Sequence, residues 1–246
     1  MTVSSFSDNY AALEGYFREQ AKQDGDCSIF LPNVSPSGPV DFIFIGMEPS
    51  LRSWARSLKD AQDQIDAGFR DFLFSLEDFI LHFCIRRFLC EKGQTYHLTN
   101  IGKAAMTVGH ASQDREARWH RWYPLLQEEI DLVRKPNVKI FAIGTEVSRF
   151  LKKNSFAPQW ATLLHHSKQA SKYRMKTILG REHQFKDFAA TISLDGVVEV
   201  AKEVMVEAKM PDLMFKRNLS RIRQSCLTTS RKALIWAYKE EFKKSR

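Results

Sequence analysis

The chain has 246 residues, of which 43% are hydrophobic, and a formal net charge of +8 at pH 7. This length suits one well-buried α/β domain with an appendage better than two full domains. No apolar run approaches the roughly 18 residues of a membrane span, and the N-terminus lacks the basic and apolar blocks of a signal peptide, so we expect a cytoplasmic protein without a membrane partner. The four cysteines form no C-x-x-C pair, and neither a metal site nor a disulfide framework is expected.

The positive charge is concentrated near the C-terminus. Residues 201–246 hold 12 Lys and Arg against 5 Asp and Glu, which leaves 25 against 24 for residues 1–200. Such a basic block suits a polyanion, because each cation that neutralises a phosphate releases counterions. It is also common on a solvated helix face, and of the two interpretations we favour nucleic acid.

The hydrophobic pattern predicts alternating helices and strands along the chain. Strands are expected within residues 40–51 and at 96–101, 138–144 and 160–165. Helices are expected at residues 6–23, 51–66, 75–90, 116–134, 145–153, 194–208, 211–224 and 228–244.

Residues 40–51, V-D-F-I-F-I-G-M-E-P-S-L, carry the first strand into a turn with a carboxylate. A continuous apolar run is typical of a buried parallel strand, and open α/β sheets bind ligands at the carboxyl ends of such strands. Gly46 permits a tight turn, and Pro49 fixes the backbone directly after Glu48. Glu48 is therefore a candidate for chemistry, and the alternative is a solvated glutamate in a strand-to-helix turn.

The second strand ends at Asn100, with Lys103 close behind. The amide of asparagine has a donor and an acceptor in one plane, so Asn100 either reads the edge of a base or forms a turn. Upstream, three aromatic residues either pack in the core or stack on a flat substrate near the Glu48 turn. These residues are Phe69, Phe72 and Phe74.

The fourth strand ends at two adjacent histidines, His165 and His166. A single histidine is more often structural than catalytic, but the polar, basic loop that follows suits phosphate groups. The loop contains Ser167, Lys168, Gln169, Ser171 and Lys172.

The alternation of strands and helices predicts a three-layer αβα sandwich with a central parallel sheet of about four strands. We expect this α/β domain to span residues 1–192. A basic helical C-terminal extension, residues 193–246, is expected to pack on or beside it. Glu48, Asn100 and His165 then all lie at carboxyl ends of strands.

Three motifs in this order resemble the uracil-DNA glycosylase superfamily. G-M-E-P-S at 46–50 is similar to its first motif, which appears as G-Q-D-P-Y, G-M-N-P-G or G-E-x-P-G. T-N-I-G-K at 99–103 is similar to its T-N-x-x-K segment, and H-H-S-K-Q-A at 165–170 is similar to its second motif, H-P-S-P-L-S. The resemblance covers residues 38–175 and implies a uracil-DNA glycosylase-like fold.

The resemblance also implies roles for individual residues. Glu48 would position the attacking water and stabilise the cationic sugar, Asn100 would read the flipped base, and His165 would donate a hydrogen bond to the leaving base. These roles are chemically coherent, because a departing pyrimidine needs donors aimed at its oxygen and an oxocarbenium-like sugar needs a nearby negative charge. The target nucleotide must first leave the base stack.

Two further sets of residues are expected from the resemblance and the charge pattern together. The base pocket would include Met47, Ser50, Phe69, Phe72 and Phe74. The DNA contacts would come from Lys103, His166, Ser167, Lys168, Gln169, Ser171, Lys172, Arg221, Arg223, Arg231 and Lys232.

The departures from the superfamily motifs are informative. The proline after His165 is missing, polar Gln169 stands at the leucine wedge position, and the cysteines do not match the iron–sulfur families, so no cofactor is expected. The uracil-specific family has a bulky tyrosine where this chain has Ser50, which suggests a pyrimidine with a larger substituent at its 5 position.

We therefore predict a monofunctional DNA glycosylase that removes a flipped-out modified pyrimidine and leaves an abasic site. The base could be 5-substituted or a hypermodified phage base removed in antiviral defence. One alternative is a uracil-DNA glycosylase of base excision repair, and the other is a catalytically inactive nucleic-acid-binding module. DNA is the expected partner, and no obligate protein partner is expected.

Overall fold

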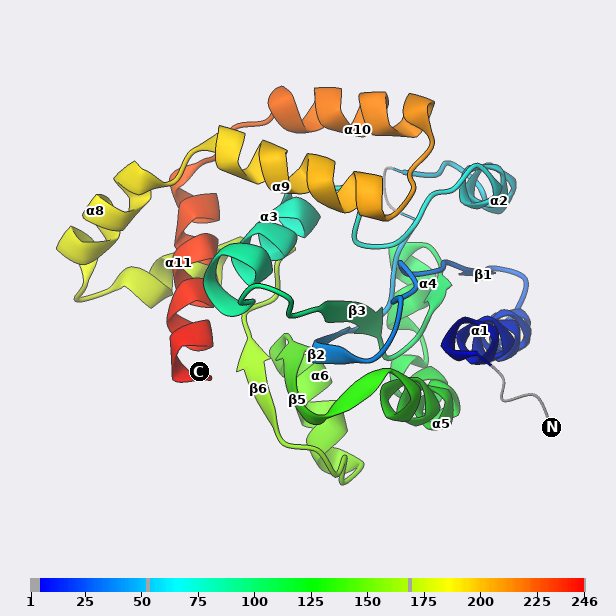
Figure 1. The fold of residues 1–246 in the computed structure, drawn as a ribbon. Helices are drawn as coiled ribbons and strands as arrows, with labels where there is room; N and C mark the ends of the chain where they lie inside the picture. The colour runs from blue at the N-terminus through cyan, green and yellow to red at the C-terminus, as the bar shows by residue number, and fades with distance from the viewer. Residues whose placement is uncertain (1–4, 52–53, 168–169, 246) are drawn as a thin grey trace. The chain divides into compact units, whose positions relative to one another are not determined.

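The computed structural model describes residues 5–51, 54–167 and 170–245, so the expected DNA contacts Lys168 and Gln169 lie outside the described residues. Figure 1 labels its helices and strands. The strands are β1 (Ile29–Phe30), β2 (Val40–Gly46), β3 (Tyr96–Asn100), β4 (Ala104–Ala105), β5 (Arg134–Ile143) and β6 (Trp160–Leu163). The α-helices are α1 (Phe6–Gln23), α2 (Leu58–Asp66), α3 (Leu76–Cys84), α4 (Val108–Ser112), α5 (Arg115–Val133), α6 (Thr145–Lys153), α7 (Ser171–Arg174), α8 (Glu182–Thr191), α9 (Leu194–Glu207), α10 (Asp212–Arg223) and α11 (Thr229–Lys244). A π-helical turn, η1 (Ile85–Leu89), continues α3, and a 3₁₀ turn, η3 (Met175–Ile178), continues α7.

Four strands form a parallel sheet in the order β3-β2-β5-β6 (Figure 1). The central strand β2 pairs on one side with β3, where Gly46 lies opposite Asn100, and on the other with β5. Strand β2 is buried along almost its whole length, which explains its continuous apolar sequence. The expected α/β class with a four-stranded parallel sheet is confirmed, and the architecture is compatible with a three-layer sandwich. None of the described helices is long and apolar enough to cross a membrane.

The chain divides into two compact units, each described by itself. Unit 1 comprises Met1–Asp71, Thr95–Ala142 and Glu146–Trp160, and unit 2 comprises Phe72–Gln94, Ile143–Thr145 and Ala161–Arg246. The domain boundary expected between residues 192 and 193 therefore falls inside unit 2. The C-terminal helices belong to the same unit as α3 and η1.

The core of unit 1 forms where α5 and α6 cover one face of the strands. Leu126, Ile130 and Val133 recur at helical spacing on α5 and pack with Ile43 and Ile140 of the sheet. Helix α1 runs beside α5 and adds a second cluster around Phe17 and Trp122 (Figure 1). These clusters fix the start of α5 against the end of β2, where the first candidate residue lies.

The core of unit 2 is helical. Helix α3 is buried on nearly every side and packs against α9 and α11. The Tyr238 hydroxyl of α11 donates a hydrogen bond to the Leu164 carbonyl just after β6, at 2.8 Å. Asn218 of α10 donates one to the Leu73 carbonyl before α3, at 2.9 Å. The helices of residues 193–246 thus share a core with α3.

Candidate active site

Glu48 follows β2 directly, and its side chain is only 6% exposed. One carboxylate oxygen accepts a hydrogen bond from Arg115 Nε at 2.8 Å, and the other accepts one from Trp119 Nε1. Burial raises the pKa of Glu48 above its ordinary value, against the opposing charge of Arg115. The site therefore holds a buried carboxylate in one orientation, beside a cation supplied by α5.

The turn that carries Glu48 is tied to the segment after β3. The Gly46 and Met47 carbonyls accept hydrogen bonds from the backbone N–H groups of Ile101 and Gly102, at 2.9 and 3.0 Å. A Cβ atom at Gly102 would lie 3.5 Å from the Trp122 ring and 3.7 Å from Glu48 Cβ. These distances are ordinary van der Waals contacts, so the two candidate segments lie against each other.

Arg115 is a site residue that the sequence did not single out. Besides Glu48, it binds Glu146 of α6 through Nη1, at 3.1 Å. It stands at the first position of α5, after Asp114, which has a left-handed φ of 45°. The sequence R-E-A-R-W-H-R-W shows several basic residues at this helix start, but nothing in it indicates which one reaches the carboxylate.

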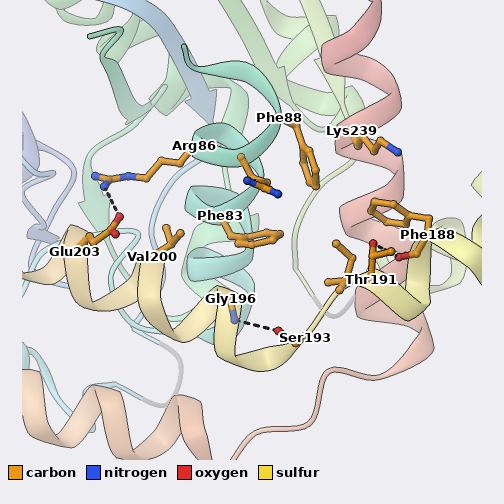
Figure 2. Close-up of a pocket in the computed structure, with 12 residues that line it drawn as sticks. Phe83, Arg86, Phe88, Phe188, Thr191, Ser193, Gly196, Val200, Glu203 and Lys239 are labelled. Atoms are coloured by element: carbon orange, nitrogen blue, oxygen red, sulfur yellow. Dashed lines mark hydrogen bonds and ion pairs between the residues drawn. The ribbon is translucent and has the colours of Figure 1, made fainter. Parts of the chain in front are cut away.

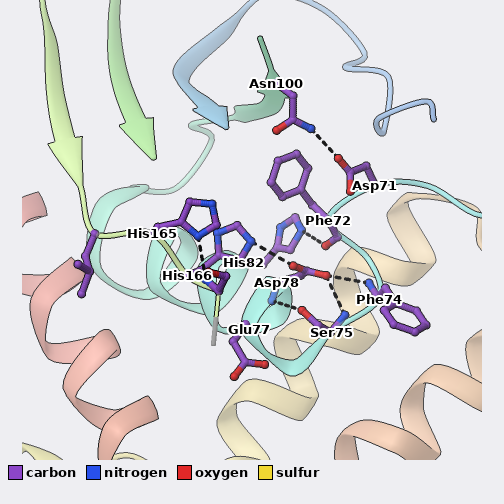
Figure 3. A network of polar contacts seen from close by, with 12 residues as sticks. Asp71, Phe72, Phe74, Ser75, Glu77, Asp78, His82, Asn100, His165 and His166 are labelled. Carbon is purple, nitrogen blue, oxygen red and sulfur yellow. Dashed lines mark hydrogen bonds and ion pairs between the residues drawn. The ribbon is translucent and has the colours of Figure 1, made fainter. Parts of the chain in front are cut away.

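Asn100 lies at the end of β3, opposite Gly46 in the sheet register. Its side-chain Nδ2 donates a hydrogen bond to Asp71 Oδ2 at 2.6 Å, and the residue is 4% exposed (Figure 3). The hydrogen of the Asn100 amide that Asp71 accepts can reach a base edge only if it leaves Asp71. Asp71 stands among the aromatic residues of F-R-D-F-L-F, where its sequence context does not mark it.

Lys103 was expected to contact phosphate, but its side chain is buried inside unit 1. It is 1% exposed, donates a hydrogen bond to the Asn100 carbonyl at 2.6 Å and forms an ion pair with Glu129 at 2.9 Å. Glu129 also binds His97 and Thr99. A buried ammonium group must be paired, and here the pairing anchors the end of β3 from inside unit 1. Burial favours a raised pKa for Glu129, but Lys103 and His97 outweigh it and lower the pKa to about 2.

His165, in unit 2, has a defined tautomer. Its Nδ1 accepts a hydrogen bond from the Ser167 backbone N–H at 3.0 Å, so a neutral ring carries its hydrogen on Nε2. Gly144, at the end of β5, has a φ of +99°, and a Cβ atom there would lie 3.3 Å from the His165 ring. The absence of a side chain at 144 thus leaves room for the His165 ring.

The residues after His165 are held from within unit 2 (Figure 3). The His166 ring stacks on His165 with centroids 4.9 Å apart, and its Nε2 lies 3.3 Å from Asp78, which also caps α3 through Ser75. Burial would raise the pKa of Asp78, but the hydrogen bond and charge of His166 lower it below its usual value. Arg174, also missed from the sequence, is buried and donates to the carbonyls of His166 and Ser167.

These contacts change what His166 and Ser167 offer a phosphate. The His166 Nε2 atom is directed to Asp78, and Ser167 is 7% exposed, so neither presents the open donor that the sequence suggested. The reason is that the loop anchors itself through its own polar groups. Of the later loop residues, Ser171 is half-buried, and Lys172 is exposed beside the Tyr173 ring.

The aromatic candidates have different environments. Phe69 is buried and stacks on Trp54 with ring centroids 4.4 Å apart, so its ring serves packing. Phe72 is buried with a left-handed φ of 59°, a strained conformation for a bulky residue. The half-buried Phe74 ring lies under the Arg221 guanidinium, at 3.8 Å.

Of the remaining candidates, some are partly or fully exposed and others bind groups of the protein. Met47 and Ser50 are half-buried beside Glu48 in the sequence. Arg221 also donates to the Phe74 carbonyl, Arg231 pairs with Glu77, and Lys232 donates to the Ala189 carbonyl. Arg223 is exposed. Three of the four expected C-terminal DNA contacts thus bind groups of unit 2.

Glu48 and Asn100 lie together in unit 1, whereas His165, His166 and Phe72 lie in unit 2. Among the residues that the structure describes, no group of three or more His, Cys, Asp or Glu side chains is arranged to hold a metal ion. No family model matches the chain, and neither the curated proteins nor the solved structures contain a match.

Proposed function

We propose that the protein is a DNA glycosylase that hydrolyses the N-glycosidic bond of a modified pyrimidine. The observation that carries this proposal is the buried, oriented carboxylate of Glu48 at the end of the central strand, with Asn100 at the end of the neighbouring strand. An ionised group with a raised pKa in a position typical of ligand binding is a candidate for catalysis.

In the proposed reaction, Glu48 acts as a carboxylate that orients a water molecule and stabilises the developing positive charge on the sugar. The bond between C1′ and the base nitrogen breaks with its electron pair going to the base, and the water oxygen forms the new bond to C1′. The proton that the water loses neutralises the departing base. His165, with hydrogen on Nε2, donates to the base oxygen as negative charge builds there. Asn100 reads the edge of the base.

The proposed substrate follows from the resemblance to the uracil-DNA glycosylase superfamily. Ser50 replaces the bulky residue that excludes a 5-substituent in the uracil-specific family, and it is half-buried. A 5-substituted or hypermodified pyrimidine is therefore the first choice, which fits antiviral defence, and uracil in base excision repair is the alternative.

One observation favours a second candidate, a nucleic-acid-binding module without catalysis. The ion pair with Arg115 offsets the charge of Glu48, and the charge of a carboxylate is what an oxocarbenium-like sugar requires. In such a module, Glu48 and Arg115 would serve only to hold β2 and α5 together.

Base release from defined duplexes distinguishes these functions. Duplexes with a single uracil, 5-hydroxymethyluracil or glucosylated hydroxymethylcytosine are incubated with the protein, and abasic sites are then cleaved with alkali. Cleavage at a modified base supports the proposal, and cleavage at uracil alone supports the repair enzyme. DNA binding without cleavage of any duplex would support the nucleic-acid-binding module without catalysis.

A further inference from the structure

Unit 2 contains a pocket of about 610 Å³ that involves none of the residues discussed above as candidates (Figure 2). It is formed by α3, η1, α9 and α11 together with the end of α8. Its volume lies within the roughly 300–1,000 Å³ of small-molecule sites. The pocket is large enough for a ligand of the size of a nucleotide.

Aromatic rings form one wall of this pocket. Phe88 lies edge-on to Phe83, with ring centroids 5.8 Å apart, and its centroid is 6.1 Å from that of Phe188. Phe83 and Phe188 are buried, whereas Phe88 is only half-buried and shows part of its ring to the pocket (Figure 2). An exposed aromatic face in a pocket suits a flat ring, because stacking buries apolar surface on both partners.

Two cations of the pocket, Arg87 and Lys239, have no carboxylate partner among the residues that the structure describes. Arg86 binds Glu203 and Glu207 of α9, so its charge is already balanced. Within the described ranges, by contrast, the side chains of Arg87 and Lys239 form neither an ion pair nor a hydrogen bond. The Lys239 Nζ atom lies 4.5 Å from the centroid of the Phe188 ring. The pocket thus places unpaired positive charge beside aromatic rings.

The hydroxyl groups of the pocket are already used by the protein. Thr191 donates to the Phe188 carbonyl at 2.7 Å, and Ser193 accepts a hydrogen bond from the Gly196 N–H at 3.2 Å where it caps α9. Burial, followed by the charge of Lys243, lowers the pKa of Lys239. A bound anion would relieve that unfavourable environment by pairing with the ammonium group, and Arg87 and Lys239 would supply charged donors to it.

We infer that this pocket binds a nucleotide unit, with its base against Phe88 and its phosphate contacted by Arg87 and Lys239. A nucleotide combines the two features that the pocket requires, a flat ring for the aromatic wall and a phosphate for the cations. The unit belongs either to a free nucleotide or to the end of a single strand. This inference concerns binding alone and does not depend on base release.

The test uses 2-aminopurine, whose fluorescence falls when it stacks on an aromatic ring. The probes are its deoxynucleoside 5′-monophosphate, the nucleoside without phosphate, and an oligothymidylate carrying it at the 5′ end. The Arg87→Ala/Lys239→Ala variant removes both cations, and Phe88→Leu keeps an apolar side chain without the ring. The matched control, Lys152→Ala/Lys186→Ala, removes the same charge from exposed positions outside the pocket.

We expect the wild-type protein to quench a phosphorylated probe and to bind the nucleoside more weakly. Loss of both cations should weaken binding by about 100-fold or more, because each charge-assisted hydrogen bond to phosphate contributes about tenfold or more. Phe88→Leu should abolish the quenching, and the control should bind normally. Quenching of the monophosphate alone identifies a free nucleotide, and quenching of the oligonucleotide alone identifies a strand end.

Several results would overturn the inference. One is a wild-type protein that quenches neither phosphorylated probe, and another is a double variant that binds as well as its control. Equal competition by polyglutamate of the same charge would show a general anion site instead. Circular dichroism and thermal unfolding of each variant confirm that the protein measured is folded.

Discussion

At the scale of single residues, Glu48 is a carboxylate held in an environment that disfavours its charge. Its raised pKa means that the ionised side chain is less stable in the folded protein than in water. A carboxyl with a raised pKa makes the fold less stable when it is ionised than when it is protonated, whereas the pKa of a carboxyl whose charge stabilises the fold is lowered. Under the proposed function, this cost keeps a charged carboxylate in place for the reaction.

Replacement of Glu48 by glutamine tests this directly. Under the proposed function, Glu48→Gln should reduce single-turnover base release by roughly 100-fold or more, as loss of one preorganised electrostatic group does. The thermal unfolding midpoint should not fall much, because the neutral amide avoids the cost of a buried charge. Glu146→Gln is the matched control, since Glu146 is the other carboxylate bound to Arg115. Full activity of Glu48→Gln would remove the carboxylate from the mechanism.

The pH dependence of the same reaction depends on Arg115. If Glu48 works ionised, base release should fall as the pH is lowered through its raised pKa, above the ordinary value of about 4.3. Arg115 opposes that rise, so Arg115→Ala should move the midpoint of the pH–rate profile to higher pH. Arg121→Ala, which removes a cation paired with Asp24 from the same helix, should leave the midpoint in place. An unchanged midpoint in Arg115→Ala would show that the ion pair between Arg115 and Glu48 does not control the pH dependence of base release.

At the scale of elements, the ends of the strands position the candidate residues. The end of β5 matters through Gly144, whose backbone N–H donates to the Leu163 carbonyl at 2.8 Å and whose Cα faces His165. The end of β3 matters through Lys103, which links the Asn100 carbonyl to Glu129 of α5. In both cases an interaction distant in sequence fixes where a catalytic candidate lies.

Gly144→Ala should impair base release by displacing His165. The new methyl group would approach the ring to 3.3 Å, and the left-handed backbone adds strain of about 1–2 kcal/mol. Gly180→Ala provides a control for the strain alone, because Gly180 also has a positive φ but has nothing within 4 Å of its would-be Cβ. Equal loss of activity in both variants, measured in single turnover, would assign the effect to backbone strain.

Glu129→Gln should destabilise the fold by about 3–5 kcal/mol, because it leaves Lys103 without its buried counter-ion. Urea unfolding measures the loss, and Glu128→Gln on the exposed face of α5 should be nearly neutral. The pKa of Glu129 is lowered to about 2, so its contribution is present above the unfolded value near 4.3 and is lost as the pH falls towards 2. The acid-induced part of the destabilisation should therefore disappear in Glu129→Gln.

At the scale of the whole molecule, several of the basic residues in the C-terminal region make contacts within the fold, so they are not all free to bind a ligand. Arg231 and Lys232 bind groups of unit 2, and Arg221 covers Phe74. Long cationic side chains do this readily, since their stems pack on apolar surface. The exposed cations of α10, Lys216 and Arg223, are better candidates for DNA contact.

Lys216→Ala/Arg223→Ala should weaken binding of modified and plain duplexes alike. If each side chain contacts one phosphate, the slope of log K against log salt should become shallower by about 0.9 per residue. Lys92→Ala/Lys152→Ala removes two exposed lysines from elsewhere and should have a smaller effect. Binding and salt slope that survive the first variant would exclude α10 as the DNA-binding surface.

Much of the fold could be predicted from the sequence because its signals are local. Helix α1 and helix α6 have the bounds that their periodicity predicted, and the four strands of the sheet lie where apolar runs predicted them. Most of the elements that were missed are short, although the ten-residue helix α8 was missed as well. Strands β1 and β4 have two residues each, which is too few to show an alternation, and α4 is a single turn and a half.

The candidate site could be predicted only in part. The motif residues Glu48, Asn100 and His165 are marked in the sequence by their place after apolar runs. Their partners are not, because Arg115 lies 67 positions beyond Glu48, and Asp71 lies 29 positions before Asn100.

By itself, then, the sequence determined most of the longer elements, the parallel sheet and the acid after its central strand. Only the tertiary structure decided that Lys103 is buried on Glu129 instead of open to phosphate, and that Arg115 and Trp119 hold Glu48. The reason is physical. Periodicity reports which face of an element is buried, whereas the partner of a buried charge is chosen by packing between elements far apart in the chain.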